Sequence, residues 1–518
     1  MESKDSHLHI HVIGSRGTGT ALALPDRFAE DTIYYNYEPD ADALGQTCEF
    51  YHERGLTERT FNIALGGYDG EAVLNLNYDP YTSSMLECST EAAHYARHHD
   101  LPNGDYIWGD VLRTVRRPRV PVRRLDGLLA EHGARLDFMT LDTQGTEFDI
   151  LQGAQQTCAT TALGFLVEVE FLPLYERQKL FPDLLNLARS WGFALAEILP
   201  HREGAFRGAP IGWQGRGFIG SADALFLKHP EAVLQTHPDP WLGLRKLAFL
   251  SICHGRMEHG LDCLTHAEAV EPRSDPGPRS YLALTDDILS AWRSSSTVAQ
   301  VRFTDLYSAE ESLARFDTTA GAKRPAAIDV RRRYFNHQDR DEFDAAIAGL
   351  LKSAPSPVER ILDRYGFGQI ASALASNRRD KALETCLAIG FFAEPGNRIM
   401  DGARTLAGSL RGSMRVAFYG TGEVYGFARR LLPVRSEQVA GIVDGDPARL
   451  GMDVDGHKVR PPGDLPGMGA GILILCSLGS ADRMADAARA CGYGGKVFTF
   501  RQLLDLVCIA ADGEFPSW

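Results

Sequence analysis

The chain has 518 residues, with 54 Lys and Arg against 68 Asp and Glu, so its formal net charge is −14. Hydrophobic residues make up 44% and charged residues 24%, a composition that excludes a disordered or fibrous protein. The acidic balance argues against general nucleic-acid binding, which needs a net basic surface. At roughly 150 residues per domain, the length predicts about three domains.

The cysteines and the N-terminus bear on the compartment. No apolar stretch reaches the roughly 20 residues that a membrane span needs. The first seven residues are polar and lack the pattern of a signal peptide. The nine cysteines are scattered and form no CxxC pair, which is the pattern of reduced thiols. We therefore expect a cytoplasmic protein without a membrane span, a disulfide framework or a zinc site.

Strand-like and helix-like segments alternate over the first 230 residues. Apolar residues share one face of a predicted helix over 181–191. Strands are predicted at 8–13, 32–37, 59–65, 136–141, 163–171, 193–199 and 222–227. Such alternation predicts a doubly wound α/β sheet, mostly parallel.

The predicted secondary structure changes at about residue 231 and again at about residue 405. Residues 231–404 have helical apolar spacing and no defensible chemical signature, which predicts a helical connector domain. Residues 405–518 begin a second, smaller Rossmann-like α/β unit. Its strands are predicted at 414–419, 439–443, 471–476 and 496–500. The predicted domains are thus 1–230, 231–404 and 405–518.

A glycine-containing loop follows the first predicted strand. It contains Gly14, Ser15, Arg16 and Gly17, and glycines there let the backbone turn tightly and approach a nucleotide. The next predicted strand ends at Glu38, where a carboxylate is placed to accept both hydroxyls of an adenosine ribose. A plain turn is the alternative explanation for the glycines.

Four acids lie at or near the ends of two further predicted strands. Asp142 ends one strand and Glu147 opens the helix after it. Glu168 and Glu170 alternate along the next strand, so they point to one face. Helix capping, the helix dipole and a solvated strand end are the alternatives to a chemical role. The alternating His7, His9 and His11 suggest a metal site only weakly, because no further ligand is spaced to complete it.

The chain resembles the FkbM family of S-adenosylmethionine-dependent methyltransferases over about its first 230 residues. The segments that carry the resemblance are 38–40, 83–86, 125–126, 142–147, 151–154, 167–175, 191–193 and 222–227. One position departs from the family, since Val12 stands where an aspartate usually helps to hold the cofactor. Without this aspartate we expect a weaker affinity for the cofactor, which would also affect methyltransferase activity.

The resemblance implies a Rossmann-like class I methyltransferase fold, with S-adenosylmethionine as methyl donor. It also implies transfer to an acceptor that is a carbohydrate or another small molecule, usually at a hydroxyl oxygen, for example in a polysaccharide precursor. The candidate cofactor residues are Gly14, Ser15, Arg16, Gly17, Glu38, Asn62 and Asp142, and either Asn62 or Ala64 is expected near the adenine. The candidates for removing the acceptor proton are Asp142, Glu147, Glu168 and Glu170, of which Asp142 and Glu168 are expected to line the pocket.

The C-terminal unit has a dinucleotide-type pattern of its own. Gly420 and Gly422 follow a predicted strand, and Asp444 ends the next one. Over roughly 100 residues this unit resembles nucleotide-binding modules of sugar-modifying and sugar-sensing proteins. We expect it to hold a nucleotide or sugar nucleotide, or to organise an oligomer. A structural unit that binds nothing is the alternative.

Two other functions compete with methyl transfer. One is an NAD-dependent oxidoreductase centred on the C-terminal unit, which lacks a recognisable Tyr-x-x-x-Lys pair. The other is a non-catalytic nucleotide-binding or scaffold protein, suggested by Val12.

Overall fold

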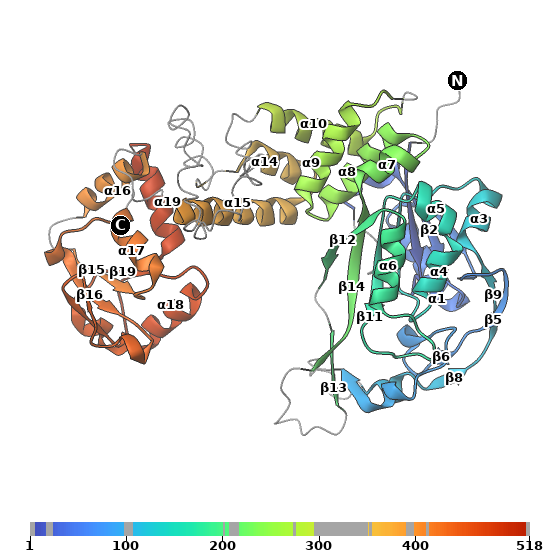
Figure 1. Cartoon of the computed structure of the whole chain (residues 1–518), viewed down its shortest axis with the longest axis horizontal. Helices are drawn as coiled ribbons and strands as arrows, with labels where there is room; N and C mark the ends of the chain where they lie inside the picture. Colours follow the sequence, from blue (N-terminus) through green and yellow to red (C-terminus); the bar gives the residue numbers. More distant parts are fainter. Residues whose placement is uncertain are drawn as a thin grey trace, which may run out of the picture. The chain divides into compact units, whose positions relative to one another are not determined.

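A computed structural model of the chain describes residues 6–16, 24–97, 107–199, 202–206, 217–272, 276–294, 351, 355–389, 398–410 and 414–513. Contacts divide the chain into two compact units. One consists of Met1–Ser290 with Ile361–Ile370, and the other of Ala291–Arg360 with Ala371–Trp518. Figure 1 labels the helices and strands.

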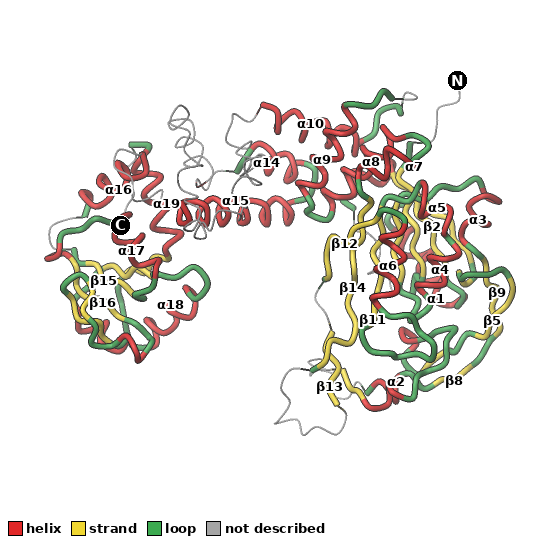
Figure 2. The backbone as a smooth tube through the Cα atoms, viewed as in Figure 1, coloured by secondary structure: helices red, strands yellow, loops and turns green. Residues whose placement is uncertain are grey.

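The first unit is built on a nine-stranded sheet (Figure 2). The path of the sheet is β3-β2-β1-β10-β11-β14-β13-β7, and β12 pairs with β14 beside β13. Strands β3, β2, β1, β10 and β11 are parallel, whereas β14 is antiparallel to β11. The bounds are β1 Leu8–Ile13, β2 Thr32–Tyr37, β3 Thr57–Phe61, β7 Tyr95–Arg97, β10 Phe138–Leu141, β11 Gly164–Glu170, β12 Phe193–Ile198, β13 Arg202–Phe206 and β14 Phe218–Lys228.

Alternate residues of these strands feed apolar clusters on the two faces of the sheet. One cluster includes Leu141, Val167 and Phe226 and packs against helices α3 to α6. On the other face, Leu225 and Leu227 pack with α7 to α9, and Ile10 packs with α1. The bounds are α1 Ala41–Glu53, α3 Leu125–His132, α4 Glu147–Gly153, α5 Gln155–Thr160, α6 Phe181–Ser190, α7 Pro230–Thr236, α8 Pro240–Cys253 and α9 Met257–Glu268.

The predicted doubly wound sheet is confirmed, with one difference at the third strand. The predicted strand 59–65 is two strands, β3 and the buried β4 (Ala64–Leu65). β4 leaves the main sheet and pairs with β9 (Arg119–Arg123), which also pairs with β5 (Gly70–Val73). The exposed residues of β3 suit an edge strand, whereas both residues of β4 are buried. The two strands therefore differ in burial as well as in the sheet to which they belong.

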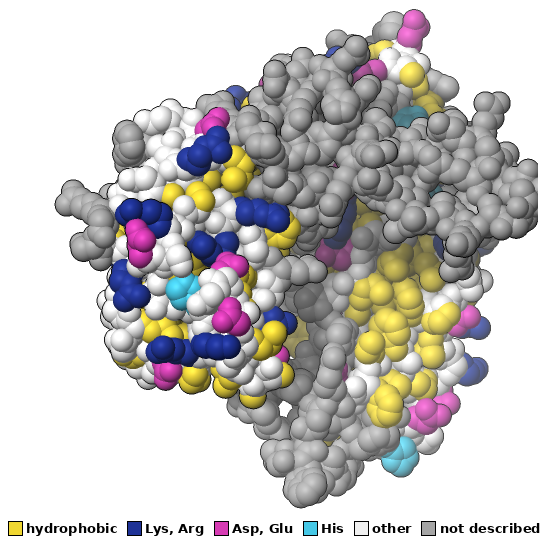
Figure 3. Space-filling model, turned by 60° about the vertical axis from the view of Figure 1, so that its left-hand side comes forward, with side chains coloured by type: hydrophobic (Ala, Val, Ile, Leu, Met, Phe, Trp, Pro, Cys, Tyr) yellow, Lys and Arg dark blue, Asp and Glu magenta, His cyan; other side chains and the backbone are white. Residues whose placement is uncertain are grey.

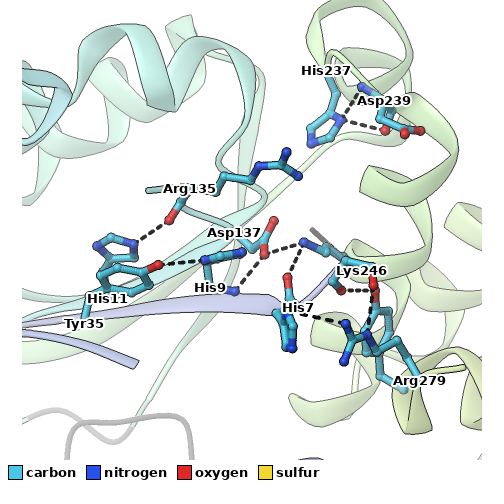
Figure 4. A network of polar contacts seen from close by, with 12 residues as sticks. His7, His9, His11, Tyr35, Arg135, Asp137, His237, Asp239, Lys246 and Arg279 are labelled. Atoms are coloured by element: carbon cyan, nitrogen blue, oxygen red, sulfur yellow. Dashed lines mark hydrogen bonds and ion pairs between the residues drawn. The ribbon is translucent and has the colours of Figure 1, made fainter. Parts of the chain in front are cut away.

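Helix α8 is tied to the sheet by a buried polar network (Figure 4). Lys246 Nζ donates to Asp137 Oδ2 at 2.7 Å and to the carbonyl oxygen of His7 at 2.6 Å. The backbone N–H of His9 donates to the same carboxylate oxygen at 2.8 Å. Burial alone would raise the pKa of Asp137, but the adjacent Lys246 ammonium holds it below its usual range. Helix α8 is thereby part of the first unit.

The N-terminal histidines take part in strand packing. His11 Nε2 lies 2.7 Å from the carbonyl oxygen of Arg135, and its Nδ1 lies 3.0 Å from the Tyr37 hydroxyl. Burial lowers the pKa of His11 to about 3, so the ring is neutral. His9 Nδ1 lies 3.1 Å from the Tyr35 hydroxyl. Within the described residues no group of His, Cys, Asp and Glu is arranged to hold a metal ion.

The second unit contains a sheet of order β17-β18-β16-β15-β19-β20. Strands β18, β16, β15, β19 and β20 are parallel, which confirms a second α/β sheet. Helices α16, α17 and α19 cover one face, and α18 covers the other. The bounds are β15 Val416–Tyr419, β16 Val439–Val443, β17 Asp453–Val454, β18 His457–Arg460, β19 Ile472–Leu475, β20 Lys496–Thr499, α16 Arg398–Ser409, α17 Glu423–Leu431, α18 Ala481–Ala490 and α19 Phe500–Ala511.

The middle of the chain is helical over its described residues, as predicted. Its remaining helices are α10 Ser280–Ser294, α14 Pro357–Arg364 and α15 Gly368–Ile389. None of the helices in the described ranges combines the length and apolar character of a membrane span. Figure 3 shows one face of the molecule. Hydrophobic side chains, in yellow, gather on its right-hand side, and Lys, Arg, Asp and Glu side chains are interspersed on its left-hand side.

Candidate functional site

A cleft of about 650 Å³, part of which is open to solvent, lies at the carboxyl ends of β1, β2 and β10. Its walls include Gly14 and Arg16 after β1, Glu38 after β2 and Asp142 after β10. Parallel strands bring these loops to one edge of the sheet, where doubly wound folds bind ligands. The cleft therefore brings together candidates that are far apart in the sequence.

The loop after β1 is shaped by Gly14. Its φ is +78°, and a Cβ there would lie only 2.0 Å from the carbonyl oxygen of Asp142. A side chain at this position would thus collide with the loop after β10. Ser15 is buried, and its hydroxyl oxygen has no hydrogen-bond partner in the described structure. The predicted cofactor residue Gly17 lies outside the described residues.

Glu38 is placed where the sequence pattern predicted a ribose-binding acid. The carboxylate is buried, and Oε1 accepts the backbone N–H of Asp40 at 2.8 Å. Burial raises the pKa of Glu38 above its ordinary value. Arg16 forms an ion pair with Asp40, so the guanidinium beside Glu38 is already engaged.

Asn62 has a supporting position at the end of β3. Its side-chain amide donates to the carbonyl oxygen of Glu38 at 2.9 Å. Asn62 is exposed and does not belong to the cleft lining, whereas the neighbouring Ile63 and Ala64 do. The structure therefore connects Asn62 to Glu38 and leaves its predicted contact with a cofactor as a prediction.

Gln144 links the carboxylates of two strands. Its Nε2 donates to Asp142 Oδ1 at 2.7 Å and to Glu168 Oε2 at 2.5 Å. The Tyr175 hydroxyl lies 3.0 Å from Gln144 Oε1 and donates to the carbonyl oxygen of Thr82 at 2.7 Å. Asp142 and Gln144 line the cleft. One amide group thus joins Asp142, which lines the cleft, to Glu168, which is not among the described residues of the lining.

Glu147 and Glu170 lie behind that wall. Glu147 accepts the backbone N–H groups of Thr143 at 2.8 Å and Gly145 at 2.9 Å, which folds the loop onto the start of α4. Burial raises the pKa of Glu147 to about 7 although these donors oppose the shift. Burial, followed by the charges of Glu147 and Glu168, raises the pKa of the fully buried Glu170 well above its usual range. All four predicted acids therefore form one cluster, of which Asp142 reaches the cleft.

A further part of the cleft wall is a turn that the sequence reasoning did not assign to the site. Pro80, Tyr81, Ser83, Ser84 and Met85 line the cleft from this side. The Ser84 hydroxyl donates to the carbonyl oxygen of Gln144 at 2.6 Å, which joins the two walls. Segment 83–86 carries part of the family resemblance, but only the fold shows that three of its residues, Ser83, Ser84 and Met85, line the same cleft as Asp142.

The roles of Gln144 and Tyr175 were also missed, although both lie within segments that resemble the family. Gln144 has a φ of +58°, a backbone conformation that a non-glycine residue seldom adopts. No sequence pattern indicates that conformation, and it turns an ordinary glutamine toward two carboxylates.

In the second unit, Gly420 and Asp444 lie at corresponding strand ends. Gly420, with a φ of +100°, follows β15, and Asp444 follows β16. Asp444 Oδ2 accepts the N–H of Thr421 at 2.8 Å and its hydroxyl at 2.6 Å, while Oδ1 accepts the N–H of Asp446 at 3.0 Å. Gly422 precedes α17. The predicted ligand-binding acid therefore holds its own glycine loop.

Comparison with known families identifies the domain that contains the cleft. Residues 17–195 match the sequence model of the methyltransferase FkbM domain. The chain thus carries an FkbM methyltransferase domain, and the predicted resemblance is confirmed over that span. A search of curated proteins finds no match.

Proposed function

We propose that the cleft of the first unit binds S-adenosylmethionine and that the protein methylates a hydroxyl oxygen of a saccharide. The observation that carries the proposal is the meeting of Gly14, Glu38 and Asp142 in one cleft at the carboxyl edge of the sheet. The FkbM domain supports methyl transfer in general, and these residues supply the groups that the reaction needs.

The residues present fit an adenosyl group. Gly14 lets the loop after β1 approach the loop after β10 closely, and Ser15 offers a buried hydroxyl without a partner in the described structure. Glu38 would accept the ribose hydroxyls, and hydrogen bonds to a charged group contribute about 1.5–3 kcal/mol. Val12 is fully packed between its neighbours at 2% exposure, so it adds no polar contact to the cleft.

The chemistry needs alignment and one proton acceptor. The bound donor supplies a methyl group already activated by its sulfonium charge. As the acceptor oxygen bonds to the methyl carbon, the carbon–sulfur bond breaks with its electron pair going to sulfur, and the hydroxyl proton is lost. Asp142 takes this proton, because it is the acid of the cluster that lines the cleft. Gln144 keeps Glu168 close by and orients both carboxylates.

The acceptor and the compartment are part of the same proposal. We place the reaction on a glycan or glycan precursor in the cytoplasm. The cysteines that the structure describes are free thiols, which fits a reducing compartment. For the second unit we propose a non-catalytic role, either structural or in binding a nucleotide or sugar nucleotide, because Asp444 is engaged by its own loop.

Calorimetry with S-adenosylmethionine and with NAD tests the proposal against its rivals. We expect one saturable site for S-adenosylmethionine on the intact chain and no comparable site for NAD. Tight binding of NAD without binding of the methyl donor would favour an oxidoreductase. Binding of neither compound would favour a scaffold.

A further inference from the structure

The turn that lines the cleft with Pro80, Tyr81, Ser83 and Ser84 is held by buried asparagines. The backbones of Asn75 and Ser84 exchange hydrogen bonds of 2.8 and 3.1 Å. The side chain of Asn77 donates to the carbonyl oxygen of Thr82 at 2.6 Å, and that of Asn75 donates to the carbonyl oxygen of Leu86 at 2.9 Å. Both asparagines are buried. The conformation of the turn is thus fixed before any ligand arrives.

This rigid turn displays aromatic rings. Tyr78 is 74% exposed and Tyr81 is 63% exposed, and Tyr81 lines the cleft beside Pro80. An ordered aromatic side chain on a fixed backbone offers a flat apolar surface at low entropic cost. Such a surface suits a ligand that has one flat apolar face and polar edges.

The charge of the cleft narrows the choice of ligand. Its charged lining residues are Glu38, Asp142 and Arg16, and Arg16 is paired with Asp40. The lining is therefore net negative and disfavours a phosphate or carboxylate beside Asp142. A neutral saccharide ring meets both requirements. It carries no charge, and it combines an apolar C–H face with hydroxyls around its rim.

Three arginines of segment 117–123, which contains strand β9, do not reverse this charge argument. Arg117 pairs with Glu87 at 2.8 Å, Arg119 with Glu71 at 3.6 Å, and Arg123 with Glu131 at 2.7 Å. These arginines are satisfied by acids on the surface, and none of the three lines the cleft.

We propose that turn 78–85 is the acceptor subsite and that Tyr81 and Pro80 pack against the C–H face of a neutral saccharide ring. The proposal rests on the proposed function and names its acceptor class. The hydrogen bonds from Ser84 to Gln144 and from Tyr175 to Thr82 hold this platform and the carboxylates in one frame. A ring on Tyr81 therefore occupies the same cleft as Asp142, the proposed proton acceptor.

Saturation-transfer NMR on the intact chain, loaded with S-adenosylhomocysteine, tests the subsite. The probes are methyl glucopyranoside, methyl mannopyranoside, maltotriose and glucose 6-phosphate. We expect transfer to the ring C–H protons of at least one neutral probe and weaker transfer to the phosphate. Tyr81→Ala should reduce the signal at least fivefold, whereas Tyr81→Phe should keep it. Tyr68→Ala should also keep it, since Tyr68 is 51% exposed but does not line the cleft.

Three results would overturn the subsite: an unchanged signal in Tyr81→Ala, a stronger signal from the phosphate, or no signal from any neutral probe. Calorimetry with S-adenosylmethionine on the same proteins separates the two proposals. If the donor binds and the saccharide results fail, only the subsite is wrong. If the wild-type chain does not bind the donor, the proposed function itself fails.

Discussion

The two parallel sheets of this chain begin with the same local pattern and end in different sites. In both, a glycine with positive φ follows the first strand, Gly14 in one and Gly420 in the other. Each donates its N–H to the last residue of the second strand, at 3.1 Å to Tyr37 and at 2.8 Å to Val443. In both, the second strand is followed by an acid, Glu38 or Asp444.

Both acids accept the backbone N–H two residues further on, Glu38 from Asp40 and Asp444 from Asp446. The difference lies in what surrounds each acid. Asp444 uses both carboxylate oxygens on Thr421 and Asp446, which stabilises its own loop. Glu38 lines a cleft, together with Asp142 from a further strand. At the position of Asp142 the second sheet has Cys476, and each donates its N–H to the end of the first strand. A strand–glycine–acid pattern alone thus predicts a loop geometry. In the first sheet, a second acid at the end of β10 lines the same cleft, and this is the feature on which the proposed site depends.

The largest effect is expected from Asp142→Asn. It removes the proposed proton acceptor while keeping a hydrogen-bonding side chain beside Gln144, so turnover should fall by about 10²- to 10⁴-fold. The rate is measured as release of S-adenosylhomocysteine with a polysaccharide extract as acceptor. Cys476→Ala, the matching change in the second sheet, should leave the rate within twofold. Equal losses in both variants would contradict the assignment.

A smaller loss is expected from Glu38→Ala. Affinity for S-adenosylmethionine should fall by about ten- to a hundredfold, because hydrogen bonds to a charged carboxylate are lost. Calorimetry measures the affinity, and thermal unfolding of the unliganded protein should change little. Asp444→Ala should keep the donor affinity. If Glu38→Ala instead unfolds the protein, Glu38 is structural.

Gly14→Ala tests whether the glycine loop of the first sheet is needed for the stability of the folded protein. The new Cβ would lie 2.0 Å from the carbonyl oxygen of Asp142 at a φ of +78°, so we expect a loss of at least about 2 kcal/mol. Gly422→Ala is the control, because a Cβ there meets nothing within 4 Å. Urea unfolding measures both. Similar unfolding midpoints for the two variants would show that the loop after β1 can move aside.

The smallest effect is expected from Glu147 and depends on pH. Its pKa is raised to about 7, so between the ordinary value of 4.5 and about 7 the folded state binds more protons than the unfolded state. Stability should therefore fall as pH rises through that window. Glu147→Gln should flatten the dependence, whereas Glu71→Gln, at an exposed side chain, should not. A wild-type melting temperature independent of pH from 5 to 8 would contradict the shift.

Strand positions were predictable because burial imposes a simple pattern. Strands β1, β2 and β16 begin and end where apolar residues predicted them. Their ends also predicted Glu38 and Asp142 at one edge. The parts of the candidate site that the sequence did not predict depend on contacts between residues far apart in the chain. Gln144 acquires its contacts from an unusual backbone conformation, and Tyr81 lines the cleft on a turn that buried Asn77 holds through the carbonyl oxygen of Thr82.

A crystal grown with S-adenosylhomocysteine tests the central claim most directly. Density for the adenosyl group should appear between Gly14, Glu38 and Asp142, with the ribose hydroxyls on the Glu38 carboxylate. A crevice that stays empty at saturating ligand, or one filled by the protein's own side chains, would contradict the account.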